Sequence, residues 1–469
     1  MSDVSVAQAH LSDIARRGLP VPLYDRSRLV PRIVHVGVGG FHRAHLAVYV
    51  HELAAAGSDW AIAGLGLLDA DAAMRDALAP QDELYTLIEK GAGEPTAEVI
   101  GSIVRYVHAP PDDGHAVADL IAAPATAILS LTVTEGGYAE PQELPGTFDR
   151  LAAGLARRRA LALGPVTVLS CDNLPGNGDA ARAAMVNAAA RIDDRLATWV
   201  GEQCTFPNSM VDRITPQTQD ADRRWLRERL GVDDRWPVVC EPFRQWVIDG
   251  EFAAGRPPWE DAGVLFTDRI HDWERYKLRF LNAGHSSIAY LSALAGVELV
   301  HEALAVPEIR AFLEELLYRE ALPTVPEIPG HPRERYVESV LERFANPGVG
   351  DQIARLCIDG SAKFRTFLVP TISRQLELGG PIDCATTALA AWARYLGTSP
   401  EIAFDASGEE ARRYGALAVD DPLAFLAFDP MSELRDSERF RTAFDAAYRK
   451  LAADGPLAAL TLARAGEPR

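Results

Sequence analysis

Residues 32–42 read RIVHVGVGGFH, a short apolar run that passes directly into glycines. The run RIVHVG is typical of a buried strand, and residues 41–56, which Gly57 ends, are typical of a helix. A strand, a glycine-rich turn and a helix in this order form the layout of a dinucleotide site. The segment therefore predicts an α/β fold with a nucleotide-binding turn.

Strand and helix signals alternate through the rest of the first half. Apolar runs typical of strands lie at residues 60–68, 98–107, 126–134 and 165–170, and helical stretches lie at residues 70–78 and 148–162. Strands that alternate with helices predict βαβ units, in which a mostly parallel sheet is covered on both faces.

Strand signals almost disappear after about residue 270. Helices are predicted at residues 276–296, 309–321, 334–345, 349–357, 385–396 and 438–453. We therefore expect two domains: an α/β domain with a mostly parallel sheet over residues 1–270, and a mainly α-helical domain over residues 271–469.

Composition excludes several classes of protein. Asp and Glu number 66 against 47 Lys and Arg, so the net charge is −19 and the chain would repel nucleic acid and anionic membrane surfaces. No apolar run approaches the roughly 18 residues that span a bilayer. The five cysteines are dispersed without a CxxC pair, which argues against disulfides and structural zinc and favours reduced thiols in the cytoplasm.

The glycine-rich turn supplies a candidate phosphate site. Gly37 would make the tight turn, and Gly39 would let the backbone approach a pyrophosphate that faces the first amides of the helix. His42 stands in place of the usual third glycine, so the strict GxGxxG pattern fails. The residues predicted to bind the cofactor here are Gly37, Val38, Gly39, Gly40, Phe41 and His42.

Two further features flank this turn. Asp69 directly follows the run WAIAGLGLL and is the first candidate to hold the adenosine ribose, with Asp71 second; the alternative is that Asp69 only caps the next helix. His42 and His45 could share a helix face, but no cysteine or carboxylate nearby completes a metal site. We therefore predict no metal, and expect a histidine and Arg43 to pack beside the cofactor.

A second constellation lies in residues 274–286, which read ERYKLRFLNAGHS. On an α-helix at about 100° per residue from Lys277, Glu274 lies at about 60°, His285 at about 80° and Asn282 at about 140°. Leucines in the same arc predict a partly buried face, where polar groups need partners. Lysine can take a hydroxyl proton, asparagine can donate to a carbonyl oxygen and histidine can orient a substrate, which suits carbonyl–alcohol chemistry. The alternative is a half-solvated face that kinks or ends at the Asn-Ala-Gly step.

The motifs GVGGFHRAH at residues 37–45 and KLRFLNAGHS at residues 277–286 resemble the two signatures of the polyol-specific long-chain dehydrogenases, the mannitol 2-dehydrogenase family. Other segments resemble the family in the same order: LTVTEGGY at 131–138, SCDNLPGNG at 170–178, MVDRITP at 210–216, EPFRQWVI at 241–248 and RFANPGVGDQIARLCIDGSAK at 343–363. The resemblance covers almost the whole chain. One departure is Gly136, where many members carry lysine, so the loop lacks that charge.

This resemblance implies a metal-independent, NAD-dependent dehydrogenase with a Rossmann-type domain, an α-helical substrate-binding domain and an active site between them. It implies that Lys277 is the general base in alcohol oxidation and the general acid in ketone reduction. Asn282 would polarise the substrate oxygen, with Asn173 as its partner in an oxyanion-type pair. His285 would orient the sugar chain, and Glu274 would assist proton exchange with solvent.

The polyol pocket implied by the resemblance includes Asp212, Arg355 and Lys363. Their alternative roles are an ion pair of Asp212 with Arg213, and solvated helix charges for the other two.

The expected reaction is hydride transfer between NAD and a linear polyol or ketose, with D-mannitol and D-fructose as the first pair. Alternatives within the family are D-arabinitol oxidation and the reduction of a hexuronate such as fructuronate, whose carboxylate would need a cation such as Arg355 or Lys363. A catalytically silent nucleotide-binding regulator is the alternative from another class, but it has no need of Lys277, Asn282 and His285 together. We expect a cytoplasmic monomer, as family members often are monomers, with no nucleic-acid or membrane partner.

Overall fold

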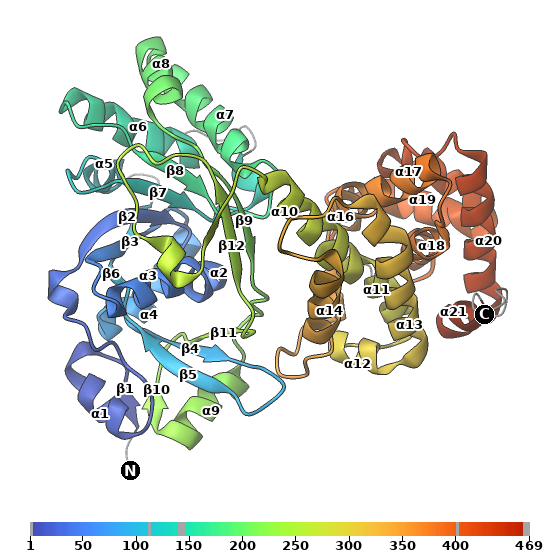
Figure 1. The fold of residues 1–469 in the computed structure, drawn as a ribbon, viewed down its shortest axis with the longest axis horizontal. Helices are drawn as coiled ribbons and strands as arrows, with labels where there is room; N and C mark the ends of the chain where they lie inside the picture. The colour runs from blue at the N-terminus through green and yellow to red at the C-terminus, as the bar shows by residue number, and fades with distance from the viewer. Residues whose placement is uncertain (1–2, 111–113, 139–145, 400–402, 463–469) are drawn as a thin grey trace. The chain divides into compact units, whose positions relative to one another are not determined.

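The structure is a computed structural model that describes residues 3–110, 114–138, 146–399 and 403–462. The chain divides into two compact units, Met1–His271 and Asp272–Arg469 (Figure 1).

The first unit is built on a five-stranded parallel sheet. Its strands are β2 (Val30–Val36), β3 (Trp60–Gly66), β6 (Ile103–His108), β7 (Ile128–Leu131) and β8 (Thr167–Ser170). They lie in the order β6-β3-β2-β7-β8, and each neighbouring pair is parallel. From β2 the chain continues to β3 and β6 on one side and then to β7 and β8 on the other. The carboxyl end of β2 is therefore the switch point, where doubly wound sheets bind nucleotides. The predicted α/β fold with a parallel sheet is confirmed.

Helices cover both faces of this sheet. Along β2, Ile33 packs into a core with α3 (Leu46–Ala55), whereas Val34 packs into a second core with α5 (Gly114–Ile121), α6 (Thr147–Ala160) and α7 (Asn177–Ala190). Successive side chains of a strand point to opposite faces of the sheet. Consecutive apolar residues such as Ile33 and Val34 are therefore buried only if helices pack on both faces. The unit also contains α1 (Leu11–Arg16), α2 (Gly40–Ala44), α4 (Ala72–Leu78), α8 (Asp194–Gln203), α9 (Asp220–Leu230) and the paired strands β1 (Val4–Ser5) and β10 (Val232–Asp233).

Two smaller sheets belong to the same unit: β11 (Val238–Cys240), β4 (Tyr85–Glu89) and β5 (Thr96–Ile100) form one, and β13 (Leu265–Phe266), β12 (Gln245–Asp249) and β9 (Asn208–Asp212) form the other. The prediction of a single strand over residues 98–107 is therefore wrong, since this stretch belongs to β5 and β6 in different sheets. The strands separate at Gly101 and Ser102, where the buried Ser102 hydroxyl donates to the carbonyl of Ala47 at 2.6 Å. That partner lies 55 residues away in the sequence, so local strand propensity does not reveal the break.

In the second unit, the described residues from 272 onward form helices and turns, with no strand among them. The helical elements are α10 (Ile270–Tyr276), η7 (Lys277–Asn282), α11 (Ala283–Leu294), α12 (Val300–Ala305), α13 (Pro307–Glu315), η8 (Leu316–Ala321), η9 (Leu322–Thr324), α14 (Arg333–Phe344), α15 (Ile353–Leu356), α16 (Gly360–Phe367), α17 (Val369–Leu378), α18 (Asp383–Thr398), α19 (Gly408–Asp420), η10 (Pro422–Ala427), η11 (Asp429–Met431), α20 (Glu438–Asp454) and α21 (Pro456–Leu462). The predicted helical character is confirmed, although α12, α16, α17, α19 and α21 lie where no helix was expected. The helix predicted over residues 349–357 shortens to α15, because Gly350 adopts a φ of +61° and Gln352 pairs with Leu299 in a short bridge.

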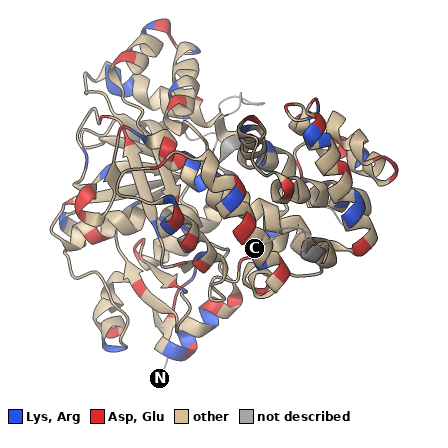
Figure 2. Ribbon diagram, turned by 45° about the vertical axis from the view of Figure 1, so that its right-hand side comes forward, with Lys and Arg blue, Asp and Glu red and all other residues tan. Residues whose placement is uncertain are grey.

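Charged residues of both signs are spread over the molecule. Figure 2 shows Lys and Arg interspersed with Asp and Glu along the described elements. In the part of the chain that the structure describes, no helix is both long and apolar enough to cross a membrane.

Glu320 is a buried carboxylate that holds the start of a distant helix. It lies in η8, a π-helical turn, and its two carboxylate oxygens accept from the backbone amides of Cys384 and Ala385 at 2.7 and 2.8 Å. These amides belong to the first turn of α18, where a helix presents unpaired N–H groups. Burial raises the pKa of Glu320 from 4.5 to about 7, although the amide hydrogen bonds oppose this shift.

This raised pKa predicts a pH-dependent stability. Between about pH 4.5 and pH 7 the folded protein binds a proton at Glu320 that the unfolded chain has released, so the free energy of unfolding falls as pH rises across this range. Glu320→Gln has no proton to lose and should remove this component, which amounts to at most about 1.4 kcal/mol per pH unit. Thermal unfolding at pH 5 and pH 8 measures it, with the exposed Glu433→Gln as control. Identical pH dependence in Glu320→Gln and the wild type would contradict the assignment.

Candidate active site

The glycine-rich turn follows β2 directly. Gly37 has a φ of +87°, and a Cβ there would collide with the backbone carbonyl of Thr132, so only glycine fits. Gly39 is extended and precedes α2. There is room for a Cβ on Gly39: among the described atoms beyond its chain neighbours, the nearest would be the carbonyl oxygen of Gly37, at 3.9 Å. Gly37 thus shapes the turn and Gly39 leaves its backbone open, which fits the close approach of a dinucleotide phosphate.

Three other residues of the turn pack against protein. Val38 is buried in the core that contains α3. Gly40 begins α2, and a Cβ built on it would lie 3.6 Å from Cγ2 of Thr215. Phe41 stacks on His45, with ring centroids 4.9 Å apart. Their contact with a cofactor stays a prediction.

His42 lies against β2 and is buried. Its ring stacks on that of His35, with centroids 3.5 Å apart, and burial holds the pKa of His42 well below 6.5. Neither ring nitrogen of His42 has a hydrogen-bond partner among the described residues. Arg43 is buried too, and donates to the carbonyl of Trp236 at 2.5 Å. His42 is therefore an uncharged packing group in this structure, and Arg43 anchors α2 to the rest of the unit.

Asp69 is exposed just beyond β3. The cap of the next short helix is supplied by Asp71, whose carboxylate accepts from the backbone amide of Leu68 at 2.9 Å, so the alternative that Asp69 is the capping residue is wrong. The Asp69 carboxylate makes no hydrogen bond or ion pair with any described residue. Its side chain is therefore available for a ribose hydroxyl, the role predicted for it.

Asn173 lies exposed after β8, beside a carboxylate that sequence reasoning missed. The buried Asp172 accepts from the backbone amide of Thr134 at 2.7 Å and from the hydroxyl of Tyr138 at 2.6 Å. It therefore ties the loop after β7 to the loop that carries Asn173. A carboxylate next to Asn173 at a predicted strand end was the available signal, but its partners could not be read from the sequence.

Asp212 is the buried last residue of β9. The neighbouring Arg213 forms an ion pair with Glu89, and also donates to the carbonyls of Glu241 at 2.9 Å and Ala44 at 2.6 Å. Arg213 thereby joins β9 to β4 and α2, while a polyol-binding role for Asp212 stays a prediction.

The lysine segment is not the plain α-helix that the sequence predicted. Between α10 and α11 the residues from Lys277 to Asn282 form a π-helical turn, in which the amide of Ala283 donates to the carbonyl of Leu278, five residues back. The wheel angle of about 140° between Lys277 and Asn282 assumed regular α-geometry and does not apply here. In i→i+5 geometry the fifth residue returns closer to the face of the first, so this turn brings the two side chains toward one face.

Contacts on both sides hold this turn. The Tyr276 hydroxyl donates to the carbonyl of His331 at 3.0 Å and accepts from the amide of Ile328 at 2.9 Å. Arg279 donates to the carbonyl of Thr366 at 2.7 Å, at the end of α16. Single π-turns inside helices are rare and are frequent at functional sites.

The polar side chains of this segment are largely buried. Lys277 and Glu274 are each 8% exposed. The carboxamide oxygen of Asn282 and Nε2 of His285 are buried atoms with no hydrogen-bond partner among the described residues. The His285 ring stacks on Phe344 with centroids 3.8 Å apart, and burial lowers the pKa of His285 to about 3, so the ring is neutral. Buried polar atoms without partners are unusual, so these two atoms are candidates to form hydrogen bonds with a ligand.

Three charged side chains lie near His285. The Asp351 carboxylate is 4.0 Å from Nε2 of His285 and forms two hydrogen bonds with Arg355, at 2.8 and 2.6 Å. Lys363 donates to the carbonyl of Leu356 at 3.0 Å, and burial followed by the charge of Arg355 lowers the pKa of Lys363 to about 8. Lys363 is therefore more than a solvated charge, whereas Arg355 is the exposed member of an ion pair, and contact of either with a polyol stays a prediction. Asp351 was missed, although an acidic residue four positions before an arginine signals a helical pair.

The predicted residues fall into two groups by unit. The glycine-rich turn, Asp69, Asn173 and Asp212 belong to the first unit, and the lysine segment, Arg355 and Lys363 belong to the second. Among the described residues, no group of three or more His, Cys, Asp or Glu side chains could hold a metal ion, and the five cysteines form no disulfide.

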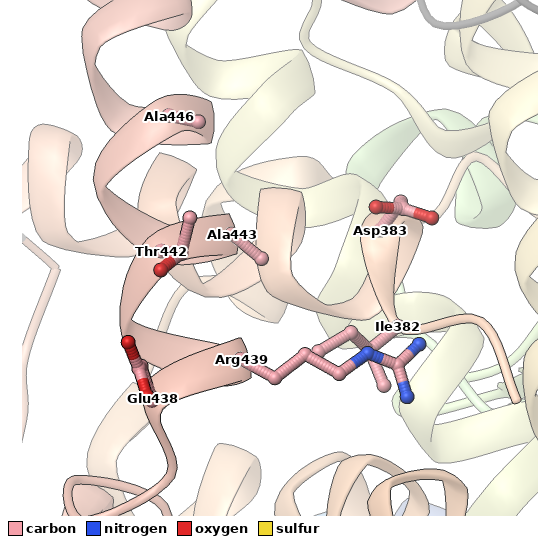
Figure 3. A pocket seen from close by; sticks show the side chains of 7 residues that line it. All are labelled: Ile382, Asp383, Glu438, Arg439, Thr442, Ala443 and Ala446. Carbon is pink, nitrogen blue, oxygen red and sulfur yellow. The ribbon is translucent and has the colours of Figure 1, made fainter. Parts of the chain in front are cut away.

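A cavity of about 540 Å³ lies elsewhere in the second unit, between the start of α18 and α20 (Figure 3). It is lined by Ile382, Asp383, Glu438, Arg439, Thr442, Ala443 and Ala446. None of the predicted site residues lines it, so it is separate from the candidate chemistry.

Comparisons with known proteins cover nearly the whole length of the chain. Residues 31–261 match the family model of the mannitol dehydrogenase Rossmann domain, and residues 269–452 match that of the mannitol dehydrogenase C-terminal domain. A mannitol 2-dehydrogenase of Aspergillus fumigatus is 40% identical over 97% of this chain and 98% of its own length. The structure of Pseudomonas fluorescens mannitol 2-dehydrogenase with NAD and D-mannitol is 36% identical, with a TM-score of 0.90 over 99% of this chain and 100% of that one. A substrate-free D-sorbitol dehydrogenase is 32% identical, with a TM-score of 0.87 over 97% of this chain and 100% of that one.

The free carboxylate of Asp69 leads to a prediction on cofactor choice. A 2′-phosphate beside this carboxylate would meet like-charge repulsion, so the chain should prefer NADH to NADPH. Asp69→Ala should reduce this preference, measured as the ratio of the NADPH to the NADH dissociation constant, by about tenfold, which corresponds to about 1.4 kcal/mol. Fluorescence titration with each cofactor measures the ratio. Asp71→Ala is the matched control: it should lower stability through its lost cap and leave the ratio unchanged. If Asp71→Ala relaxes the preference and Asp69→Ala does not, the assignment is wrong.

Proposed function

The chain belongs to the mannitol dehydrogenase family, and from this we propose that it is an NAD-dependent oxidoreductase that interconverts a linear polyol and its ketose, with D-mannitol and D-fructose as the pair. The observation that carries the proposal is the lysine segment, in which Lys277 and Asn282 share one widened turn and His285 follows nearly one turn later. The fungal relative named mannitol 2-dehydrogenase and the bacterial structure with NAD and D-mannitol support this pair.

The alternatives are less well supported. The two solved relatives reported above carry the names of mannitol and sorbitol dehydrogenases, which do not favour D-arabinitol or a hexuronate. A silent nucleotide-binding regulator would not need buried polar groups on the lysine segment. A cytoplasmic location and a monomeric state stay predictions.

We assign cofactor binding to residues 1–270, and the lysine segment with Arg355 and Lys363 of the polyol pocket to residues 271–469. The turn from Gly37 to His42 and the carboxylate of Asp69 would hold the NAD pyrophosphate and ribose. Asp212, Arg355 and Lys363 would contact the hydroxyl groups of the sugar chain.

The side chains have distinct roles in the proposed reaction. Bound NAD supplies the hydride acceptor for polyol oxidation. Lys277, in its neutral form, would take the hydroxyl proton and would return it during ketone reduction. Asn282 and Asn173 would hold the oxygen on which negative charge develops. His285 is neutral and would bind a hydroxyl without adding charge, while Glu274 would pass the proton toward solvent.

Removing Lys277 tests the mechanism. Lys277→Ala should lower kcat for polyol oxidation by about 10²–10⁴-fold, the usual effect of losing a general base. NADH binding, measured by fluorescence, should be nearly unchanged. In the wild type, oxidation should rise with pH because only neutral lysine accepts a proton, and ketone reduction should fall because it needs the protonated form.

The matched control for this variant is Asn282→Ala. Small external amines should restore part of the oxidation rate in Lys277→Ala by acting as a substitute base, but they should not rescue Asn282→Ala, whose role is hydrogen bonding. Near-wild-type turnover of Lys277→Ala on D-mannitol would show that the mechanism is wrong.

The proposal also predicts activity without a metal. In zinc-dependent alcohol dehydrogenases the ion stabilises the alkoxide, and here Lys277 and Asn282 would do so. D-mannitol oxidation should persist after exhaustive treatment with a chelator, and elemental analysis should find no stoichiometric zinc. A stoichiometric metal whose removal abolishes turnover and whose return restores it would contradict this mechanism.

A further inference from the structure

Asp351 is a buried carboxylate to which the proposed reaction gives no role. Its carboxylate is 5% exposed, whereas the side chain of its partner Arg355 is 51% exposed. The backbone around Asp351 is fixed, because its carbonyl accepts from the amide of Val300 at 2.9 Å and the amide of Ile353 donates to Glu298 at 2.8 Å. The carboxylate is therefore a rigid element, and the arginine is the more accessible partner.

The pair has the geometry of strong carboxylate recognition. Nε of Arg355 donates to one oxygen of Asp351 at 2.8 Å, and Nη2 donates to the other at 2.6 Å. Such a bidentate contact uses the same edge of the guanidinium that would bind the carboxylate of a ligand. Burial alone would raise the pKa of Asp351, but the hydrogen bonds and charge of Arg355 hold it below its ordinary value. Asp351 is thus ionised at neutral pH and occupies this edge.

Other charges face the same region. The positive charges of Lys363 on α16, Arg343 on α14 and Arg355 each lower the pKa of His285. The negative charge of Asp351 raises this pKa. Lys363 is directed to backbone carbonyls, those of Leu356 at 3.0 Å and Arg355 at 3.5 Å. The Asp351 carboxylate therefore offsets part of a positive cluster next to His285.

We propose that Asp351 is a specificity-determining residue that selects neutral polyols and ketoses against sugar acids. It occupies the bidentate edge of Arg355, so the carboxylate of a hexuronate would have to displace a buried, rigid carboxylate or lie beside its charge. The same contact fixes the position of Arg355 and leaves its remaining N–H groups for substrate hydroxyls. This inference rests on the proposed function and on the place of Arg355 in the polyol pocket.

The test compares two substrates that differ in charge. The values of kcat/KM for the reduction of D-fructose and of D-fructuronate by NADH are measured for the wild type and Asp351→Asn. The variant frees the guanidinium edge, so the ratio of fructuronate to fructose should rise by about tenfold or more. The change should come mainly from KM, because Asp351 positions Arg355 and does not act on the reacting carbon. An unchanged ratio in a folded variant would overturn the proposal.

Asp359→Asn is the matched control. This carboxylate lies in the same stretch of chain but accepts from the amide of Ala406 at 2.7 Å, so its neutralisation should leave the substrate ratio unchanged. An equal rise in Asp359→Asn would show that any lost negative charge has this effect, and would overturn the specific role of Asp351.

A second variant keeps the proposal testable if Asp351→Asn does not fold. Arg355→Gln removes the more exposed partner and leaves Asp351 uncompensated, so the fructuronate to fructose ratio should fall below that of the wild type. No change in this ratio would overturn the proposal. Failure of the proposed function has a different signature: a wild-type protein that binds NADH but reduces neither substrate. A wild type that prefers fructuronate would overturn the role of Asp351 while leaving the dehydrogenase family intact.

Discussion

The wide helical turn from Lys277 to Asn282 is the constraint on which the proposed chemistry depends. A regular α-helix would direct Asn282 away from Lys277, and the i→i+5 bonding returns it toward the same face. Tyr276 and Arg279 hold the turn on both sides through backbone groups of distant segments. The arrangement of Lys277 and Asn282 therefore depends on contacts with segments that are far away in the sequence.

In the first unit, close contacts hold the loops at the carboxyl ends of the parallel strands. Gly37 lies against the carbonyl of Thr132, and Asp172 accepts from Thr134 and Tyr138. The loops after β2, β7 and β8 are thereby linked at the edge where doubly wound sheets bind dinucleotides. Gly37 is therefore required by the backbone approach of Thr132 itself.

Two buried carboxylates of the second unit, Glu320 and Asp351, have partners that fix the positions of the elements around them. Two backbone amides at the start of α18 compensate Glu320, and Arg355 compensates Asp351. Removing one partner of a buried ion pair leaves a charge uncompensated and lowers the free energy of unfolding by about 3–5 kcal/mol. Each pair therefore constrains both of its elements, and the Asp351 pair places a half-exposed guanidinium next to His285.

Local patterns in the sequence were sufficient for the strand and glycine-rich turn at residues 32–40, for the change from α/β to helical structure, and for gathering the polar residues from Glu274 to His285 in one segment. The single helix predicted at residues 41–56 is instead two helices, α2 and α3, separated at His45. These features depend on periodicity and on residues close together in the chain, which a sequence displays directly. Tertiary structure alone decided the break at Gly101 and Ser102, the π-turn at Lys277, and the partners of Asp172 and Asp351. Each of these depends on hydrogen bonds to backbone or side chains that folding brings together, so propensity and spacing could not specify them.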